Sequence, residues 1–295
     1  MIRFEKITTL AEAESYWKKF SPHQTICDNW EYRYNFYKYF GYEILFFLGF
    51  VDNQPIGILP LQRNTDKHVL EFFGGSYMED NKVFIFPGFE AYIKNFYEQI
   101  QEPCQLEYIS SDDDYTKTFE LLGYKYTLPL QGIQNFEEYL VRYLDGEARG
   151  KMRRKVKKVE QNTVEIQKNI FEDVEKLFEY NEVAFGMDST FHLPFRKESF
   201  RDILKLNFPI YLMTFRINGE IKGISLAVVY NGVYEYLNLG AALDVRELRT
   251  YIHIKNIEEA IRAGVPILNA FNADCGWKEL FHFQKTPQYK FDKTP

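Results

Sequence analysis

One pattern occurs twice in this chain at a fixed separation. Residues 46–61 read FFLGFVDNQPIGILPL, and residues 212–227 read LMTFRINGEIKGISLA. In both segments an apolar strand leads into a polar turn, and a glycine begins a second apolar strand. These glycines, Gly57 and Gly223, are 166 positions apart. Self-similarity at one long offset indicates two copies of one structural unit, so it constrains both the domain count and the fold.

The length and composition fit a pair of folded domains. A chain of 295 residues is long enough for two domains of ordinary size, and its 18% aromatic residues exceed what disordered chains carry. No stretch reaches the roughly 18 apolar residues of a membrane helix, and the N-terminus has no signal-peptide h-region. The cysteines (Cys27, Cys104 and Cys275) form neither a disulfide framework nor a zinc pattern. We therefore expect a cytoplasmic protein without a metal site.

The hydrophobic pattern predicts a mixed α/β (α+β) fold with domains at 1–128 and 151–295 and a connector at 129–150. In the first half we expect strands at 43–51, 56–62, 68–73, 83–86 and 105–109, and helices at 9–19 and 90–101. The aromatic segment 29–40 suits a helix or a strand. In the second half we expect strands at 163–167, 210–217, 221–230, 233–241 and 266–271, and helices at 151–161, 171–185, 196–207 and 251–263.

Four segments in a fixed order resemble a known family. They are FFGGSYMEDNKVFIFPGFE at 72–90, the basic helix KMRRKVKKVE, the stretch FGMDSTFHLPFRKESF, and the run from YEYLNLGAALD through CGWKELF. Their order resembles the GNAT-type acyltransferase fold, in the tandem form of FemAB-like aminoacyl transferases and cellulose-biosynthesis-associated acetyltransferases. The resemblance spans about residues 40–285. It implies two GNAT-like domains in tandem, each a mixed, mostly antiparallel sheet flanked by helices.

The resemblance also implies a donor-binding loop before the last long helix. Ordinary GNAT enzymes hold the coenzyme A pyrophosphate there with an Arg/Gln-x-x-Gly-x-Gly/Ala run at a helix N-terminus. The corresponding residues here are Arg246, Glu247, Leu248, Arg249, Thr250 and Tyr251. Arg249 and Tyr251 replace the small residues, and guanidinium groups can hold phosphate through their side chains instead. We expect Arg246, Arg249, Thr250, Tyr251 and Arg153 to bind the donor, and we expect the donor site in the second copy.

Acyl transfer to an amine needs a base, donors for an oxyanion and alignment of the two substrates. The catalytic candidates are Asp80, Glu235, Asn238 and Asp274, and the substrate-binding candidates are Glu79, Tyr236 and Lys278. Asp80 and Lys278 stand at the positions where the family has an acidic residue and a lysine. Several candidates have an alternative: Glu235 as a solvent-facing strand residue, Tyr236 as a packing residue, Glu79 and Asp80 as an ordinary surface loop, and Lys278 as a surface lysine. The five histidines form no metal-ligand spacing, and we interpret them as structural or surface residues.

Residues 149–158 carry seven basic residues and no acidic one, although the whole chain has a net charge of −6. This segment is interpreted as a solvated helix face, a phosphate-binding surface or a contact for an anionic membrane. Its short apolar stripe argues against the membrane contact. The net charge argues against DNA as a partner.

We therefore expect an N- or O-acyltransferase that moves an acyl group directly from acyl-CoA, such as acetyl-CoA, to a small molecule, peptide or cell-envelope precursor. Two alternatives remain open: a FemAB-like transferase that uses aminoacyl-tRNA, and a catalytically inactive binding module. An open tunnel between the loop 246–251 and the strand 233–241 would favour an enzyme.

Overall fold

The computed structural model describes residues 2–110, 113–272 and 276–294. The chain divides into two compact units: residues 1–125 together with 286–295, and residues 126–285. The sequence pattern places residues 286–295 with the second half and 126–128 with the first, so the division differs from the expected one at both ends. The C-terminal residues lie in the first unit because they pair with one of its strands.

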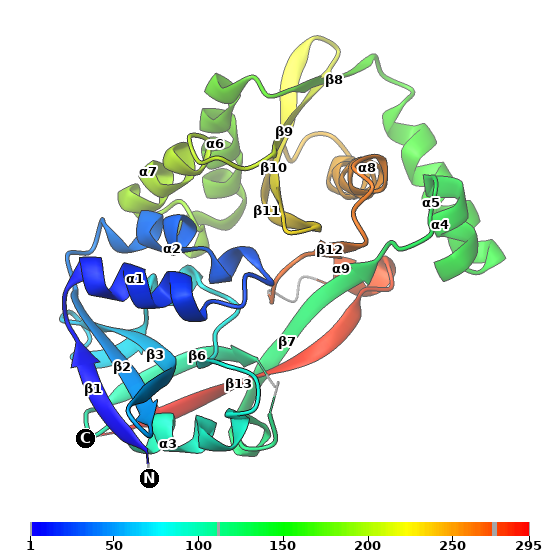
Figure 1. Cartoon of the computed structure of the whole chain (residues 1–295). Coiled ribbons are helices and arrows are strands. Elements are labelled where there is room, and N and C mark those ends of the chain that lie inside the picture. Colours follow the sequence, from blue (N-terminus) through cyan, green and yellow to red (C-terminus); the bar gives the residue numbers. More distant parts are fainter. Residues whose placement is uncertain (1, 111–112, 273–275, 295) are drawn as a thin grey trace. The chain divides into compact units, whose positions relative to one another are not determined.

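The first unit is a mixed sheet with helices on both faces (Figure 1). Its strands are β1 (Arg3–Ile7), β2 (Glu43–Val51), β3 (Gln54–Asn64), β4 (Val69–Phe72), β5 (Phe84–Ile85) and β6 (Cys104–Ser110), and its helices are α1 (Leu10–Phe20), α2 (Trp30–Tyr37) and α3 (Ile93–Glu98). The strand order is β1-β2-β3-β4-β6, followed by β13 (Gln284–Lys293). The β4–β6 pair is parallel, and β5 pairs with β3. The ambiguous aromatic segment is therefore the helix α2, and the side chain of Asn29 caps its start.

The second unit repeats this arrangement. Its strands are β8 (Val164–Lys168), β9 (Ile210–Ile217), β10 (Glu220–Tyr230), β11 (Val233–Ala241) and β12 (Ile267–Asn269), and its helices are α4 (Phe136–Tyr143), α5 (Gly146–Val159), α6 (Val174–Phe185), α7 (Pro194–Ile203), α8 (Leu248–Arg262) and α9 (Trp277–Leu280). The strand order is β8-β9-β10-β11-β12, followed by β7 (Glu120–Pro129). The β11–β12 pair is parallel, and the other pairs are antiparallel.

The two hairpins of the repeated pattern have the same register. In the first unit Gly49 lies opposite Gly57, and a bulge follows at once. In the second unit Phe215 lies opposite Gly223 with a bulge at the equivalent step, so every pair is displaced by the same 166 positions. Each hairpin turns through two residues with positive φ, as a two-residue turn requires. The offset read from the sequence is confirmed by strand register.

Opposite faces of each sheet bury different side chains. In the first unit Phe46 and Leu48 pack towards α1 with Trp17, whereas Leu45 and Phe47 belong to the cluster that contains α3. This alternation follows from the two-residue period of a strand. In the second unit a Cβ on Gly223 would meet α8, and one on Gly240 would meet α6. Figure 1 shows α8 and α6 on opposite sides of β10 and β11.

Each unit receives its last strand from the far part of the sequence. Residues 127–129 of β7 pair with β12 in the second unit, although β7 follows β6 along the chain. Residues 288–293 of β13 pair with β6 in the first unit. The final strands are therefore exchanged relative to sequence order.

The described helices include none with both the length and the apolar character needed to cross a membrane.

Candidate functional site

A cavity of about 570 Å³ opens in the second unit where two parallel strands separate. β11 pairs with β12 only from Val233 to Glu235, and β12 ends at Asn269 while β11 continues to Ala241. Residues 236–241 of β11 therefore line the cavity, beyond the stretch that pairs with β12. A strand that extends past its neighbour presents backbone N–H and C=O groups to the space beside it. We call this space, which is lined by β11, α6, the start of α8 and residues 270, 277 and 278, the second-unit cavity.

A β-bulge shapes the wall of this cavity. The pairing of β11 with β10 shifts between Tyr236 and Asn238, so Leu237 is an extra residue on β11. A bulge bends the strand and changes which way the following side chains point. The Asn238 amide oxygen accepts a hydrogen bond from Asn181 Nδ2 at 3.1 Å, which fixes its orientation at the cavity wall.

The N-terminal turn of α8 forms another wall. Arg249 and Thr250 line the cavity, and the first intrahelical bond runs from the Tyr251 N–H to the Glu247 carbonyl. The N–H groups of the residues before Tyr251 therefore have no helical acceptor, as at any helix start. The Arg249 guanidinium lies 5.7 Å from the Phe185 ring centre. Lys155 of α5 contacts the Glu247 carboxylate at 3.1 Å and so offsets its negative charge.

A histidine, a tyrosine and a tryptophan form the inner end of the cavity. The His253 ring stacks on Trp277 with 3.7 Å between ring centres, and its Nδ1 is 3.2 Å from the Tyr236 hydroxyl. Burial, together with the positive charges of Arg249 and Lys278, lowers the pKa of His253 to about 3. The imidazole is therefore neutral at neutral pH, and burial raises the pKa of Tyr236 well above its ordinary value. The pair is a neutral hydrogen-bonded unit.

Lys278 adds a second positive charge to Arg249 at this cavity. Its Nζ donates to the Phe271 carbonyl at 3.1 Å and lies 4.5 Å from the Tyr126 ring centre, and only 2% of the residue is exposed. The only carboxylate among the described lining residues is Asp188, so the cavity has a positive balance.

Five of the predicted site residues line the second-unit cavity: Tyr236, Asn238, Arg249, Thr250 and Lys278. Glu235 does not line it; the residue is fully buried and accepts a hydrogen bond from Asn269 Nδ2 at 2.7 Å, so it is not a solvent-facing strand residue. Asp274 lies outside the described residues.

Tyr251, Arg246 and Arg153 lie away from the cavity lining. Tyr251 is buried in the core and donates a hydrogen bond to Glu160, because it points to the opposite side of α8 from Arg249. The Arg246 side chain is 78% exposed, and Arg153 on α5 forms an exposed ion pair with Glu137.

Asp80 and Glu79 lie in the first unit. Asp80 is buried, with Lys125 Nζ at 2.5 Å and the Ser110 hydroxyl donating to its other oxygen. Burial alone would raise its pKa, but Lys125 and Lys82 outweigh burial and lower the pKa to about 2. The backbone carbonyl of Glu79 accepts a hydrogen bond from Gln288. Asp80 is thus part of a buried ion pair.

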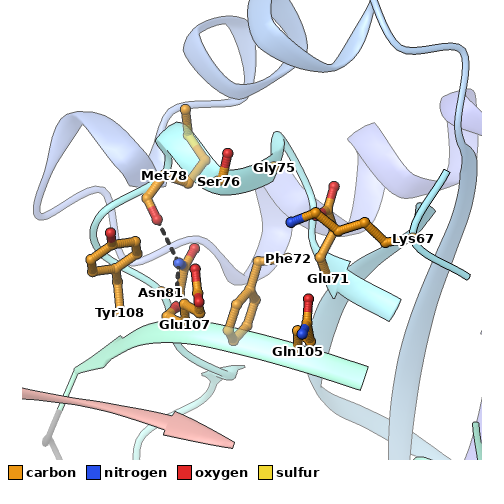
Figure 2. Close-up of a pocket in the computed structure, with 10 residues that line it drawn as sticks. All are labelled: Lys67, Glu71, Phe72, Gly75, Ser76, Met78, Asn81, Gln105, Glu107 and Tyr108. Carbon is orange, nitrogen blue, oxygen red and sulfur yellow. Dashed lines mark hydrogen bonds between the residues drawn. The ribbon is translucent and has the colours of Figure 1, made fainter. Parts of the chain in front are cut away.

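A small cavity lies beside this acidic loop (Figure 2). In Figure 2 the Asn81 amide stands between the carbonyl oxygens of Met78 and Glu107, and donates to both. The cavity volume is about 20 Å³, which is enough for about one water molecule. This space is too small for a substrate.

The histidine and the tryptophan were missed by sequence reasoning. His253 follows Arg249 by four positions and therefore shares its helix face, so the helical period carried a signal for it. Trp277 carried none, because its approach to α8 depends on the tertiary fold. Within the described ranges, no three His, Cys, Asp or Glu side chains gather as a metal site.

Comparison with known proteins found a family model and several solved structures that resemble this chain. Residues 146–279 match the family model for the acetyltransferase (GNAT) domain. No curated protein matches the sequence with significance. FemX shares the fold with a TM-score of 0.64 at 10% identity, covering 98% of this chain and 96% of that one. L-PGS from Bacillus licheniformis has a TM-score of 0.61 at 10% identity, covering 98% and 93%.

A tandem GNAT protein from the clavulanic acid biosynthesis pathway is similar along its whole length. Its TM-score is 0.56 at 10% identity, and the likeness covers 100% of this chain and 99% of that one. At such identities the likeness establishes the fold. The family match places a GNAT acetyltransferase domain in the second unit, and the solved structures show that the whole chain has a tandem GNAT-like fold.

Proposed function

We propose that the chain is an acyltransferase that moves an acyl group from acyl-CoA, such as acetyl-CoA, to an amine or hydroxyl of a small molecule, a peptide or a cell-envelope precursor. One observation carries the proposal: the part of β11 that extends past β12 lies beside the start of a 15-residue helix, and Arg249 of that helix lines the same cavity. An acyl-CoA donor also implies a cytoplasmic location.

The start of α8 suits the phosphates of the donor. The Leu248 N–H donates to the Val245 carbonyl, whereas the N–H groups of Arg249 and Thr250 have no helical acceptor. Such groups, together with the helix dipole, favour an anion. The Arg249 guanidinium adds two parallel donors, and Lys155 offsets the charge of Glu247, which would otherwise repel phosphate. Glycine is absent from this loop, so side chains replace the close backbone approach of ordinary GNAT enzymes.

The edge of β11 suits the rest of the donor. The amide groups of a pantetheine arm can pair with the backbone of β11 as an added strand would. Asn238, fixed by Asn181, then presents its side chain beside the acyl group. Glu235 acts through Asn269, whose amide it binds, so we assign it a positioning role rather than contact with substrate.

The bound donor supplies an activated thioester. Transfer breaks its C–S bond and forms a C–N or C–O bond, and the acceptor loses one proton. Asp188 is the carboxylate that lines the described part of the cavity, so we assign it as proton acceptor. The neutral Tyr236–His253 pair keeps a hydroxyl at the inner end, where it can donate a hydrogen bond to developing negative charge.

Isothermal titration with acetyl-CoA and free coenzyme A tests the donor. We expect micromolar binding, which is about −8 kcal/mol. Arg249→Ala should weaken it about 10- to 100-fold, as expected for a charge-assisted hydrogen bond. Arg246→Ala is the matched control, because that exposed arginine lies outside the cavity lining, and it should bind as the wild type does. Equal losses in both variants, or no binding to the wild type, would contradict the proposal.

Aminoacyl-tRNA is the second candidate donor. Lys151, Arg153 and Lys155 of α5 pair with carboxylates, whereas Arg154, Lys157 and Lys158 are exposed and form no ion pair within the described ranges. Those three cations favour a polyanionic partner. If charged tRNA binds and acetyl-CoA does not, this candidate replaces the first. If neither binds, the chain is the inactive binding module, although the open cavity favours an enzyme.

A further inference from the structure

The first unit contains a counterpart of β11 that is interrupted. In the second unit β10 pairs with one continuous strand, from Ala227 opposite Tyr236 to Gly223 opposite Ala241. In the first unit the equivalent residues of β3 pair with two separate strands: Leu61 lies opposite Phe72 of β4, and Gly57 lies opposite Ile85 of β5. The 166-residue offset relates Leu61 of β3 to Ala227 of β10 and Gly57 to Gly223. β4 and β5 together therefore occupy the position of β11, with residues 73–83 in place of residues 237–239, which include the bulge of β11.

The first unit also has a cavity at the position equivalent to the second-unit cavity. It has a volume of about 320 Å³ and lies among the end of α1, β5, the start of α3 and the end of β6. The second-unit cavity lies among the end of α6, the last part of β11, the start of α8 and the end of β12. β6 follows β4 in the first unit as β12 follows β11 in the second, and β5 pairs with β3 as the last part of β11 pairs with β10. We call this space the first-unit cavity.

The first-unit cavity is unsuited to a phosphate. The helix beside it, α3, has 6 residues, whereas α8 has 15. Where Arg249 lies at the start of α8, Glu90 lies at the corresponding edge in the first unit. The Glu90 carboxylate accepts a hydrogen bond from the Gly88 N–H at 2.9 Å. This backbone donor is therefore already bonded to a negatively charged side chain of the protein.

The charges at the first-unit cavity favour a cation. Its described lining carries the carboxylates of Glu90 and Asp113 and a single ammonium, Lys82. That ammonium donates to Gln24 at 2.7 Å. Burial raises the pKa of Asp28 although the charge of Lys82 opposes it, and Lys125 together with Lys82 lowers the pKa of Asp80, so Lys82 already lies near two buried carboxyl groups. The described lining of the second-unit cavity has the opposite balance, with two cations and one carboxylate.

Apolar and aromatic side chains line much of the rest of the first-unit cavity. Phe20, Phe84 and Tyr97 line it, together with Ile93. Aromatic faces attract organic cations and also bury hydrocarbon. We propose that the first-unit cavity binds a small organic ammonium ion with an alkyl or arylalkyl group, whose charge lies near Glu90 and Asp113 and whose hydrocarbon packs on Phe20 and Phe84.

Equilibrium titration with a charged ligand and its neutral isostere tests this inference. The probes are 2-phenylethylamine and 2-phenylethanol, followed by chemical shifts or heat. We expect the amine to bind with a submillimolar to millimolar dissociation constant, and the alcohol to bind at least about tenfold more weakly, because it lacks the charge. Equal binding of the two probes, or no binding of the amine at 10 mM (a concentration about tenfold above the expected constant), would overturn the proposal.

Variants locate the site. Glu90→Gln changes an exposed side chain, and Asp113→Asn removes a charge while keeping an oxygen that can accept from Thr116. Each should weaken amine binding about three- to tenfold. Arg249→Ala in the other unit should leave amine binding unchanged while it weakens acetyl-CoA. Loss of amine binding in Arg249→Ala with none in Glu90→Gln and Asp113→Asn would refute the site. Amine binding without acetyl-CoA binding would refute the proposed function alone.

Discussion

The two units use one framework and fill it with opposite charges. Both units have the same hairpin register and the same bulge. Each has a cavity beside the strand that pairs with the second strand of its hairpin, which is β11 in the second unit and β5 in the first. In the second unit that strand is continuous and a long helix begins with an arginine at the cavity. In the first unit the strand is interrupted, the helix is short and a glutamate takes the corresponding place. The fold therefore fixes where a ligand can bind, and a few side chains decide which ligand.

Removing the Asp80 carboxylate should lower the free energy of unfolding more than any other substitution in either unit described below. Asp80→Asn leaves Lys125 in a largely buried place without the carboxylate it contacts, and breaking such a pair costs about 3–5 kcal/mol. Urea unfolding at pH 7 measures it. Asp80→Leu with Lys125→Met removes both charges and should recover part of the loss. A stability unchanged in Asp80→Asn would show that the pair does not hold the first unit together.

The Asp80–Lys125 ion pair predicts that the first unit loses stability at low pH. The pKa of Asp80 is about 2 in the fold, below its ordinary value of 3.8. The unfolded chain therefore binds more protons between these values, and the stabilisation is present above about pH 4 and lost as the pH falls towards 2. The Asn variant should lack this dependence.

His253 gives the second unit a different acid limit. Its pKa is about 3 in the fold against an ordinary 6.5, so the unfolded chain binds the extra proton between those values. Stability is complete above about pH 6.5 and falls with pH by up to about 1.4 kcal/mol per unit. His253→Phe keeps a ring beside Trp277 and should flatten this slope between pH 6 and 4. If the free energy of unfolding changed equally with pH in the wild type and in His253→Phe, His253 would be protonated in the folded protein.

The equivalent glycines should respond unequally to one added methyl group. A Cβ on Gly57 would lie 2.5 Å from the Phe84 carbonyl oxygen, whereas one on Gly223 would lie 2.6 Å from the tip of the Ile252 side chain. A side-chain tip can move and a paired backbone cannot. Gly57→Ala should cost about 2–3 kcal/mol and Gly223→Ala about 1 kcal/mol, by urea unfolding. The reverse order would contradict the rigidity assigned to the β3–β5 contact.

Arg153→Ala should have the smallest effect. The arginine forms an exposed ion pair with Glu137, and such pairs contribute little. We expect no measurable change in the thermal midpoint or in acetyl-CoA affinity. A large loss of affinity would extend the donor site to α5, and the contrast between the two cavities would then no longer depend on Arg249 alone.

Local patterns predicted most of the fold, and long-range pairing accounts for what they missed. The hairpins, α8 and the buried strands were predicted from the spacing of their hydrophobic residues and from their turn residues. β1, β7 and β13 were not predicted. β13 reads QKTPQYKFDK, which is polar with a proline, and only its pairing with β6 makes it a strand.

The candidate site was predicted in part for a similar reason. The resemblance drew attention to the run 246–251, and Arg249 and Thr250 line the cavity. Tyr251 was grouped with them by adjacency, but neighbouring helix residues point about 100° apart, which directs it to the core. Roles for Glu235 and Lys278 depend on burial, which the sequence does not state. Their assignments remain proposals.

The exchanged final strands affect how the protein is made. β6 pairs with residues 288–293, so its sheet edge stays open until those residues have been synthesised. The second unit spans residues 126–285, and its translation at about 5–20 residues per second takes roughly 10–30 s. During that interval the nascent first half presents an unpaired strand to the cell. A chaperone that covers strand edges would raise the yield of this protein, and a stop codon before residue 288 would release a first unit that lacks the strand that pairs with β6.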